Sequence, residues 1–493
     1  MNNIRLRLAP SPTGFLHLGN LRTALFGFLL AKSMGGKFIL RIEDTDQKRE
    51  VEGAVDSLLN ILKWVGITFD EGPHIGGDYG PYIQSQRLDI YKKQADELLA
   101  KGGAYRCFCS SERLAKMREE QTAAKQPPRY DRTCRNLSPA DIEAKLTNNE
   151  PFVIRQAMPL EGEVKVIDEL RGEIIFKVAD LEDHVLLKSD GVPTYQLASV
   201  VDDHLMKISH VTRGDEWLPS FPKNVLLYQA FGWEVPKFIH LPLILNKTGG
   251  KLSKRQGDVF VEDYKTRGYL PEALINFCAM LGWHPKTDKE IFTLAELEKE
   301  FNIEGLGASP AVFDEEKLDF YNGHYIRQTN IEKLTELILP YLVESNFIER
   351  ITNYDLRIKK TAKTISLDYI KAIVALEQER LKNLSEIKDR VSYFFEEPDY
   401  EADLLIWKGL SRAQVKNNLS ELKDKLESLP DFNQLETATL AWLKDSGKKN
   451  GDYLWPMRVA LTGLKASPGP FEVALVLGKD QVISRLKTAI AKL

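Results

Sequence analysis

The first 46 residues alternate between strand and helix patterns. Residues 4–9 alternate apolar and polar side chains, as a short strand does. The segment 10–14, PSPTG, ends that strand because two prolines and a glycine cannot continue a central strand. From Leu18 apolar residues recur at helical spacing until the glycines at 35 and 36, and a second strand is expected over 37–42. Strand, turn, helix and strand predict a βαβ unit, and therefore a parallel sheet with crossover helices.

Length and composition indicate a multidomain globular chain. At roughly 150 residues per domain, 493 residues suggest about three domains. Hydrophobic residues make up 43% and charged residues 28%, and a net charge of −4 gives no hint of a nucleic-acid partner. Four cysteines fit a reducing compartment better than a disulfide scaffold. Since no apolar stretch is long enough for a membrane span and no signal-peptide pattern opens the sequence, we expect a cytoplasmic enzyme without a membrane partner.

The pattern changes twice further along the chain. Between about 88 and 189, helical stretches bracket three of the cysteines and short strand patterns follow, which indicates an insertion into the sheet domain. Beyond Gly268 nearly every stretch has helical periodicity, including 331–344, 367–384 and 473–493. The second half is therefore expected to be an all-α assembly.

Two short motifs carry groups suited to phosphate. His17-Leu-Gly19 lies where the first strand turns into a helix, and a helix N-terminus presents unpaired N–H groups. Gly19 allows close approach of a ligand, and His17 can donate a hydrogen bond. Lys251-Leu-Ser-Lys254-Arg255 places three cations within five residues, beside glycines, and can close over a polyphosphate. Taken singly, each has a plainer interpretation, a capping histidine in a tight turn and a solvated basic turn.

Together the motifs resemble the HIGH and KMSKS motifs of class I aminoacyl-tRNA synthetases, and longer segments are similar to bacterial glutamyl-tRNA synthetases. Those segments are RLAPSPTG at 7–14, FILRIEDTD at 38–46, SDGVPTY at 189–195, VVDDHLM at 200–206, TRGDEW at 212–217 and MRVALTG at 457–463. The resemblance runs from Arg5 to the last helix. Asn20 replaces the last histidine of HIGH, and Leu252 and Arg255 vary KMSKS, as is usual in glutamyl enzymes.

The resemblance implies an α/β fold with five segments. Residues 1–87 and 190–245 would form the two halves of a Rossmann-like catalytic domain. The α+β insertion at 88–189 would bind the acceptor end of tRNA. Residues 246–324 would hold the KLSKR loop and a helical stem-contact region, and 325–493 would form an all-α anticodon-binding domain.

The implied reaction has two steps. The glutamate carboxylate attacks the α-phosphorus of Mg²⁺-bound ATP, and the terminal adenosine hydroxyl of the glutamate tRNA then attacks the acyl-adenylate. The expected partners are therefore ATP with Mg²⁺, L-glutamate and tRNA, and we expect a monomer. The first step needs positioning and charge neutralisation. The resemblance assigns catalysis to His17, Gly19, Lys251 and Lys254.

The resemblance also assigns two binding sets. The residues expected to bind ATP are His17, Gly19, Glu216, Trp217, Leu243, Ile244 and Lys254. The residues expected to bind glutamate are Arg7, Ala9, Ser11, Glu43, Tyr195, Ser199 and Arg213. Glu43 suits the ammonium group, and an arginine presents a planar fork to a carboxylate. Arg7 and Glu43 could instead form an ion pair at two strand ends. Ser199 stands where the family often has asparagine, which leaves that contact open.

Three other classes of protein share part of this pattern. Glutaminyl-tRNA synthetase shares the fold, but Arg213 places a cation where glutaminyl enzymes carry a neutral residue, and those enzymes read the anticodon with β-barrels. A non-catalytic paralogue usually loses catalytic-loop residues, and His17, Gly19, Lys251 and Lys254 are all present. A short tRNA-modifying relative lacks the helical half.

The insertion carries a candidate structural zinc site. Cys107-x-Cys109 and Cys134 resemble the zinc-binding pattern of some family members. Some relatives supply a histidine two residues after the third cysteine, where this chain has Asn136; a related synthetase-like protein uses a phenolate at the position of Tyr130. The candidate ligands are therefore Cys107, Cys109, Tyr130 and Cys134. Reduced cysteines in a zinc-free insertion are the alternative, and Cys278 is expected to be a core residue.

Overall fold

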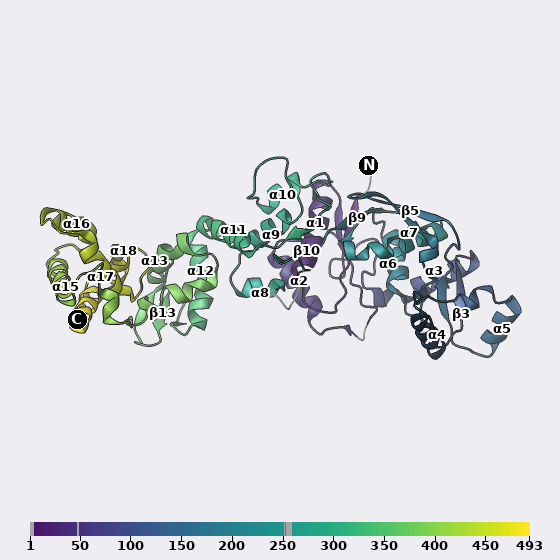
Figure 1. Ribbon diagram of the computed structural model, residues 1–493, viewed down its shortest axis with the longest axis horizontal. Coiled ribbons are helices and arrows are strands. Elements are labelled where there is room, and N and C mark those ends of the chain that lie inside the picture. Colours follow the sequence, from purple (N-terminus) through teal and green to yellow (C-terminus); the bar gives the residue numbers. More distant parts are fainter. Residues whose placement is uncertain (1–3, 47–48, 251, 253–258) are drawn as a thin grey trace. The chain divides into compact units, whose positions relative to one another are not determined.

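The computed structural model describes residues 4–46, 49–250, 252 and 259–493 (Figure 1). The chain divides into two compact units. Unit 1 comprises residues 1–264 and 271–315, and unit 2 comprises residues 265–270 and 316–493. Within the described ranges, none of the helices is both long and apolar enough to span a bilayer.

The βαβ unit predicted at the start of the chain is present. Strand β1 (Arg5–Leu8) runs parallel to β2 (Lys37–Leu40), and α1 (Leu18–Ser33) connects them. Helix α1 begins after His17, which caps it, and ends before Gly35, whose φ of 65° is favourable for glycine. The Rossmann-like α/β class expected from the sequence is thus confirmed.

A four-stranded sheet completes the frame around α1, with strand order β6-β5-β9-β8. Its strands are β5 (Glu163–Asp168), β6 (Gly172–Lys177), β8 (His210–Gly214) and β9 (Lys237–Leu241). Strands β8 and β9 are parallel, and β5 joins β9 in parallel where Asp168 pairs with Phe238. Strands β5 and β6 thus bring part of the segment 88–189 into the sheet that also holds β8 and β9.

Helix α1 is buried on nearly all sides, because apolar residues occupy almost its whole surface. It contacts β1, β2 and β8 on one side and α9 and α10 elsewhere. A Cβ on Gly27 would lie 3.1 Å from the Phe38 ring and 3.0 Å from Thr212 Oγ1. This glycine therefore permits the close approach of α1 to β2 and β8, which positions the N-terminus of the helix beside the ends of the strands.

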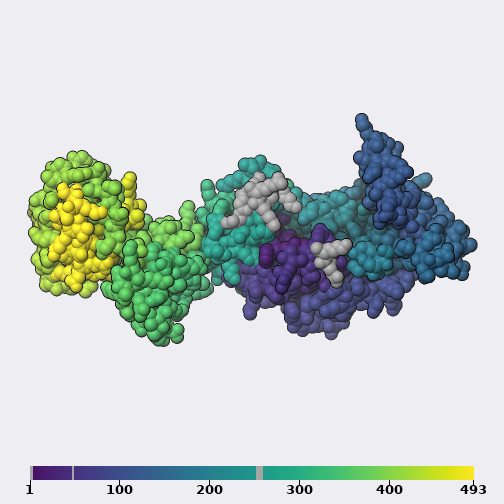
Figure 2. Space-filling view, turned by 90° about the horizontal axis from the view of Figure 1, so that it is seen from below, coloured from purple at the N-terminus to yellow at the C-terminus, as the bar shows by residue number. Residues whose placement is uncertain are grey.

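The other elements of unit 1 lie around this frame. The segment 88–189 also contains a second sheet, of order β3-β4-β7, and residues coloured blue project from the rest of unit 1 (Figure 2). The bounds are α2 (Ala54–Trp64), α3 (Leu88–Ala100), β3 (Ala104–Cys107), α4 (Ser111–Ala123), α5 (Pro139–Thr147), β4 (Val153–Gln156), β7 (Val185–Leu187), α6 (Tyr195–Leu205), α7 (Phe221–Phe231), β10 (Ile244–Leu245), α8 (Val261–Thr266), α9 (Pro271–Met280), α10 (Leu294–Glu300) and β11 (Ala311–Val312).

Unit 2 is mainly helical, as the sequence predicts. Its helices are α11 (Glu315–Gln328), α12 (Ile331–Glu344), α13 (Leu367–Glu377), α14 (Ile387–Arg390), α15 (Arg412–Glu427), α16 (Leu435–Asp445), α17 (Asn450–Thr462), α18 (Pro470–Leu477) and α19 (Lys479–Lys492). The expected helix over 473–493 is interrupted at Gly478, which has a φ of 84°.

One small sheet departs from the all-α expectation. Strands β12 (Ile348–Arg350), β13 (Asp355–Ile358) and β14 (Thr364–Ser366) form an antiparallel meander in unit 2. Each strand has only three or four residues, so its alternation is too short to be distinguished from helical periodicity. Leu356 and Ile365, paired across β13 and β14, are buried.

A buried ion pair links β1 to the segment after α2. Both Nη atoms of Arg5 donate to the two carboxylate oxygens of Glu71 at 2.8 Å, and Tyr82 and Lys37 donate to the same carboxylate. The hydrogen bonds from Arg5 are the largest cause that lowers the pKa of Glu71 to about 2. Ionised Glu71 therefore stabilises the fold, and this contribution is complete only above the pKa of the unfolded chain, about 4.5.

We predict that Glu71→Gln lowers the free energy of unfolding by roughly 3 kcal/mol at pH 7, since one pKa unit corresponds to about 1.4 kcal/mol. The difference from wild type should shrink as pH falls below about 4.5, because wild-type Glu71 then loses its advantage. Urea denaturation at pH 7, 4.5 and 3.5 measures this. Glu97→Gln, which breaks the exposed pair with Lys101, is the control and should change little. A difference independent of pH would contradict the assignment.

Candidate functional site

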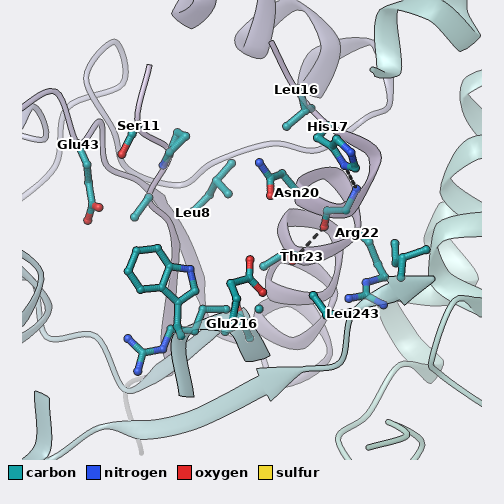
Figure 3. Close-up of a pocket in the computed structure, with 18 of the residues that line it drawn as sticks. Leu8, Ser11, Leu16, His17, Asn20, Arg22, Thr23, Glu43, Glu216 and Leu243 are labelled. Atoms are coloured by element: carbon teal, nitrogen blue, oxygen red, sulfur yellow. Dashed lines mark hydrogen bonds between the residues drawn. The ribbon is translucent and has the colours of Figure 1, made fainter. Parts of the chain in front are cut away.

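A cavity of about 540 Å³ lies where the parallel strands end (Figure 3). Residues that follow β1, β2, β8 and β9 line it, together with the N-terminal turn of α1. Ligands of open α/β sheets bind at this edge. The predicted site residues that line the cavity are Arg7, Ala9, Ser11, His17, Gly19, Glu43, Tyr195, Arg213, Glu216, Trp217, Leu243 and Ile244.

His17 caps α1, and this contact selects the tautomer of its neutral imidazole. Its Nδ1 accepts a hydrogen bond from the backbone N–H of Gly19 at 3.1 Å (Figure 3). A neutral imidazole that accepts at Nδ1 carries its proton on Nε2, so the remaining ring nitrogen is a donor. The capping interpretation and the ligand-binding interpretation are therefore compatible in this geometry. The cap orients a donor beside the helix N-terminus, where a phosphate is favoured.

Gly19 is not required by the packing of the protein. A Cβ at this position would meet only His17 Nδ1, at an ordinary distance of 3.5 Å. Because Gly19 lines the cavity, the missing side chain leaves room for a ligand to approach the start of α1.

Glu43 contributes a carboxylate to the lining of the cavity, and buried arginines lie near it. Arg41 donates to Glu43 Oε1 at 3.0 Å, while Arg7 pairs with Asp203 at 3.0 Å. Arg7 and Glu43 are therefore not paired with each other among the described ion pairs. Burial raises the pKa of Glu43, and Arg41 and Arg7 partly offset that effect. Glu43 thus offers a carboxylate to the cavity from a buried position.

Arg213 differs from these arginines because its contacts are neutral. Its Nε donates to His240 Nε2 at 2.9 Å, and its Nη1 lies 3.2 Å from Asn224 Oδ1 and 3.4 Å from Tyr195 Oη. Its buried Nη2 has no hydrogen-bond partner in the described part of the chain. Burial lowers the pKa of Arg213, as expected for a cation without an acidic partner. The ring of Trp217 packs against Tyr195, 4.5 Å between centroids.

Among the described residues, one predicted residue, Ser199, does not join this set. Ser199 lies on α6, buried, and is not among the residues that line the cavity; its hydroxyl has no partner in the described structure. Lys251 and Lys254 lie outside the described residues.

Sequence reasoning missed Arg22. It lies on α1, lines the cavity and donates to the carbonyl oxygens of Pro242 and Leu281. Burial lowers the pKa of Arg22 to about 10. The available signal was an arginine in an otherwise apolar stretch of the helix, LRTALFGFLL.

The candidate zinc ligands converge in the insertion. The Sγ atoms of Cys107, Cys109 and Cys134 lie within 4.8 Å of one another. The Tyr130 hydroxyl lies 3.2 Å from Cys107 Sγ and 3.5 Å from Cys109 Sγ, and it accepts from the backbone N–H of Cys134. These spacings suit a tetrahedral Zn²⁺ with S₃O ligands. Cys278 is buried in α9, apart from the cluster, as expected for a core residue.

Two arginines lie against the cysteine cluster. Arg113 donates to Cys109 Sγ at 3.3 Å, and the guanidinium of Arg155 stacks 3.9 Å above the Tyr130 ring. Three thiolates and a phenolate around Zn²⁺ carry a net charge of −2, which Arg155 would partly offset, while Arg113 is also paired with Asp131. The charge environment therefore fits a metal with this ligand set.

Two family models match the chain. Residues 3–320 match "tRNA synthetases class I (E and Q), catalytic domain", and residues 333–490 match "Anticodon binding domain". The chain therefore belongs to the class I tRNA synthetases of the glutamate and glutamine group.

Similar proteins narrow this class. The chain is 44% identical to a glutamate--tRNA ligase of Clostridioides difficile, with 98% of each chain covered, and 45% identical to one of Clostridium tetani, with 100% and 98% covered. A crystal structure of an Elizabethkingia meningosepticum glutamate tRNA ligase in complex with its amino acid superposes with a TM-score of 0.89, at 35% identity and 99% coverage of both chains. Within the class, the chain is a member of the glutamate--tRNA ligase family, which confirms the resemblance.

We predict that Gly19→Ala raises the KM for ATP by about tenfold or more, because an added methyl group would occupy space in the cavity. The melting temperature should not fall, since alanine fits the local packing and favours the helix. Steady-state kinetics and thermal unfolding measure the two effects. Gly307→Ala is a matched control, because its Cβ would also meet only ordinary contacts, 3.7 Å or more away. A normal KM for ATP would remove Gly19 from the nucleotide site.

Proposed function

We propose that this chain ligates L-glutamate to the glutamate tRNA, in two steps through a glutamyl-adenylate. The observation that carries the substrate assignment is Arg213, a buried cation with neutral partners that lines the cavity. A γ-carboxylate would supply the missing negative charge. The amide of glutamine could not, which disfavours the glutaminyl alternative.

The nucleotide would lie at the α1 end of the cavity. His17 would donate to a phosphate oxygen while the N-terminal turn of α1 offers its N–H groups. Glu216, Trp217, Leu243 and Ile244 line the same cavity and would hold the rest of the nucleotide. Lys251 and Lys254 would stabilise the charge that develops at the α-phosphate and on pyrophosphate. Mg²⁺ bound to ATP would neutralise part of the phosphate charge.

The amino acid would lie at the other end. Glu43 would accept hydrogen bonds from the α-ammonium group, and Arg213 would bind the γ-carboxylate. Arg7, Ala9, Ser11 and Tyr195 would complete the pocket. In this arrangement the α-carboxylate would be directed toward the α-phosphorus, and the residues would accelerate adenylate formation by positioning. The contact of Ser199 would have to be indirect, because Ser199 does not line the cavity.

Transfer RNA would use both units. The insertion would hold the acceptor end and the helical unit would bind the anticodon arm, which the matched anticodon-binding model over 333–490 supports. The five segments with boundaries at 87, 189, 245 and 324 remain our proposal for the domains. We further propose that the protein acts as a monomer in the cytoplasm.

Zn²⁺ would brace the insertion. Cys107, Cys109, Tyr130 and Cys134 would hold it, and the metal would stabilise a small subdomain without taking part in the reaction.

We predict that Arg213→Ala raises the KM for glutamate at least about 30-fold, since truncating one partner of a buried charge pair costs 2 kcal/mol or more. The KM for ATP should change much less, and the preference for glutamate over glutamine should narrow. Aminoacylation of purified glutamate tRNA with each amino acid measures these values. If wild-type protein fails to charge this tRNA with glutamate, the proposed function is wrong; if only the variant behaves normally, Arg213 has another role.

We predict about one equivalent of zinc in protein purified without added metal, measured by elemental analysis. Cys107→Ser should lose most of it and lower the melting temperature, because structural zinc contributes folding energy. Cys278→Ala removes a buried cysteine outside the cluster and should retain the metal. Less than about a tenth of an equivalent in wild-type protein, with all four thiols titrating freely, would exclude the site.

A further inference from the structure

Two buried residues, His240 and Asp168, are hydrogen-bonded in series to Arg213 and have no role of their own in the proposed reaction. Arg213 on β8 pairs in register with His240 on the neighbouring strand β9, and Asp168 ends the next strand, β5. Arg213 Nε lies 2.9 Å from His240 Nε2, and His240 Nδ1 lies 2.7 Å from Asp168 Oδ2. All three side chains are buried. Three adjacent strands thus contribute one residue each to a continuous hydrogen-bonded line.

The chemistry of these groups determines the direction of each hydrogen bond. An ionised Asp168 only accepts, so His240 Nδ1 carries a proton and donates to it. His240 Nε2 then has a lone pair and accepts from Arg213 Nε–H, which is always a donor. Asp168 cannot easily turn, because its Oδ1 accepts from the backbone N–H groups of Leu170 and Arg171. The line therefore holds one histidine tautomer and one orientation of the guanidinium.

Neutral His240 separates the carboxylate of Asp168 from the guanidinium of Arg213. Arg7 and Arg41 contact the carboxylate of Asp203 directly, and Arg41 also contacts Glu43, so their two charges are already balanced inside the protein. A carboxylate in direct contact with Arg213 would likewise compete with a ligand carboxylate. His240 orients the guanidinium through Nε without neutralising it, and the Nη2 edge retains an unused donor.

We propose that His240 and Asp168 are positioning residues that set the selectivity for glutamate by fixing Arg213 as an oriented, uncompensated cation. The inference rests on the proposed function, because it names the residues that prepare the γ-carboxylate site. Neither residue is among those that line the cavity, so both would act through Arg213. Their loss should therefore affect glutamate recognition more than ATP binding or the chemical step.

The main test is His240→Phe, which removes the acceptor while retaining a ring among the neighbouring Phe221 and Phe238. We expect the KM for glutamate to rise about ten- to a hundredfold, because a buried Arg213 donor loses its partner. The KM for ATP and kcat at saturating glutamate should stay within about threefold of wild type. His240→Gln restores an acceptor and should recover part of the glutamate affinity. His204→Phe, at a histidine stacked on Trp233 outside the cavity, is the matched control.

A second variant keeps the test informative if His240→Phe does not fold. Asp168→Asn retains shape but places an amide where His240 Nδ1–H and the His240 backbone N–H need an acceptor. It should raise the KM for glutamate and reduce discrimination against glutamine, with a smaller effect on ATP. A glutamate KM within twofold of wild type, or one that rises in step with the KM for ATP, would overturn the proposal. Wild-type protein that does not activate glutamate would instead refute the proposed function.

Discussion

Two adjacent buried carboxylates on α6, Asp202 and Asp203, connect this helix to three other segments of unit 1. Asp203 accepts from Arg7 at the end of β1 and from Arg41 after β2, at 3.0 and 2.7 Å. Asp202 accepts from Arg87 at 2.7 Å. Breaking a buried pair of this kind costs about 3–5 kcal/mol, because one charge is left uncompensated. One turn of α6 therefore fixes the ends of β1 and β2, whose neighbouring residues line the cavity.

This arrangement separates Arg7 and Arg41, which stabilise the fold through acidic partners, from Arg213, which has neutral partners among the described residues. Arg7 and Arg41 are balanced by Asp203 and Glu43, so they preserve the shape of the cavity. Arg213 is buried equally well but is oriented by a neutral histidine, so its charge remains uncompensated. Burial without a counterion is unfavourable for the free protein, and binding of a carboxylate would relieve it. In the proposed site, the fold would thus supply part of the selectivity for glutamate.

In the segment 88–189, the spacing of the cysteines predicted part of the candidate metal site. The sequence identified Cys107, Cys109 and Cys134 as a ligand set, with Asn136 unsuited as the fourth member and Tyr130 the candidate that the resemblance named instead. The structure brings the Tyr130 hydroxyl to the same point, because the turn before Cys134 folds it back onto the thiols. The small sheet at 348–366 is the opposite case. Its strands are stabilised by pairing with each other, a non-local contact that no helical or strand periodicity over three residues can indicate.

The sequence by itself determined the opening βαβ unit, the motif at His17 and Gly19 and the family, because these depend on local patterns and on the identity of neighbouring residues. Only the tertiary structure decided that Arg213, like Arg22, lines the cavity without an acidic partner among the described ion pairs. Arg7 and its partner Asp203 lie 196 positions apart, and the expected alternative partner, Glu43, binds Arg41 instead. The structure likewise excluded Ser199 from the lining of the cavity and placed Asp168, from the inserted segment, behind Arg213. Such pairings follow from how distant strands and helices pack, which is a property that the order of residues along the chain does not display.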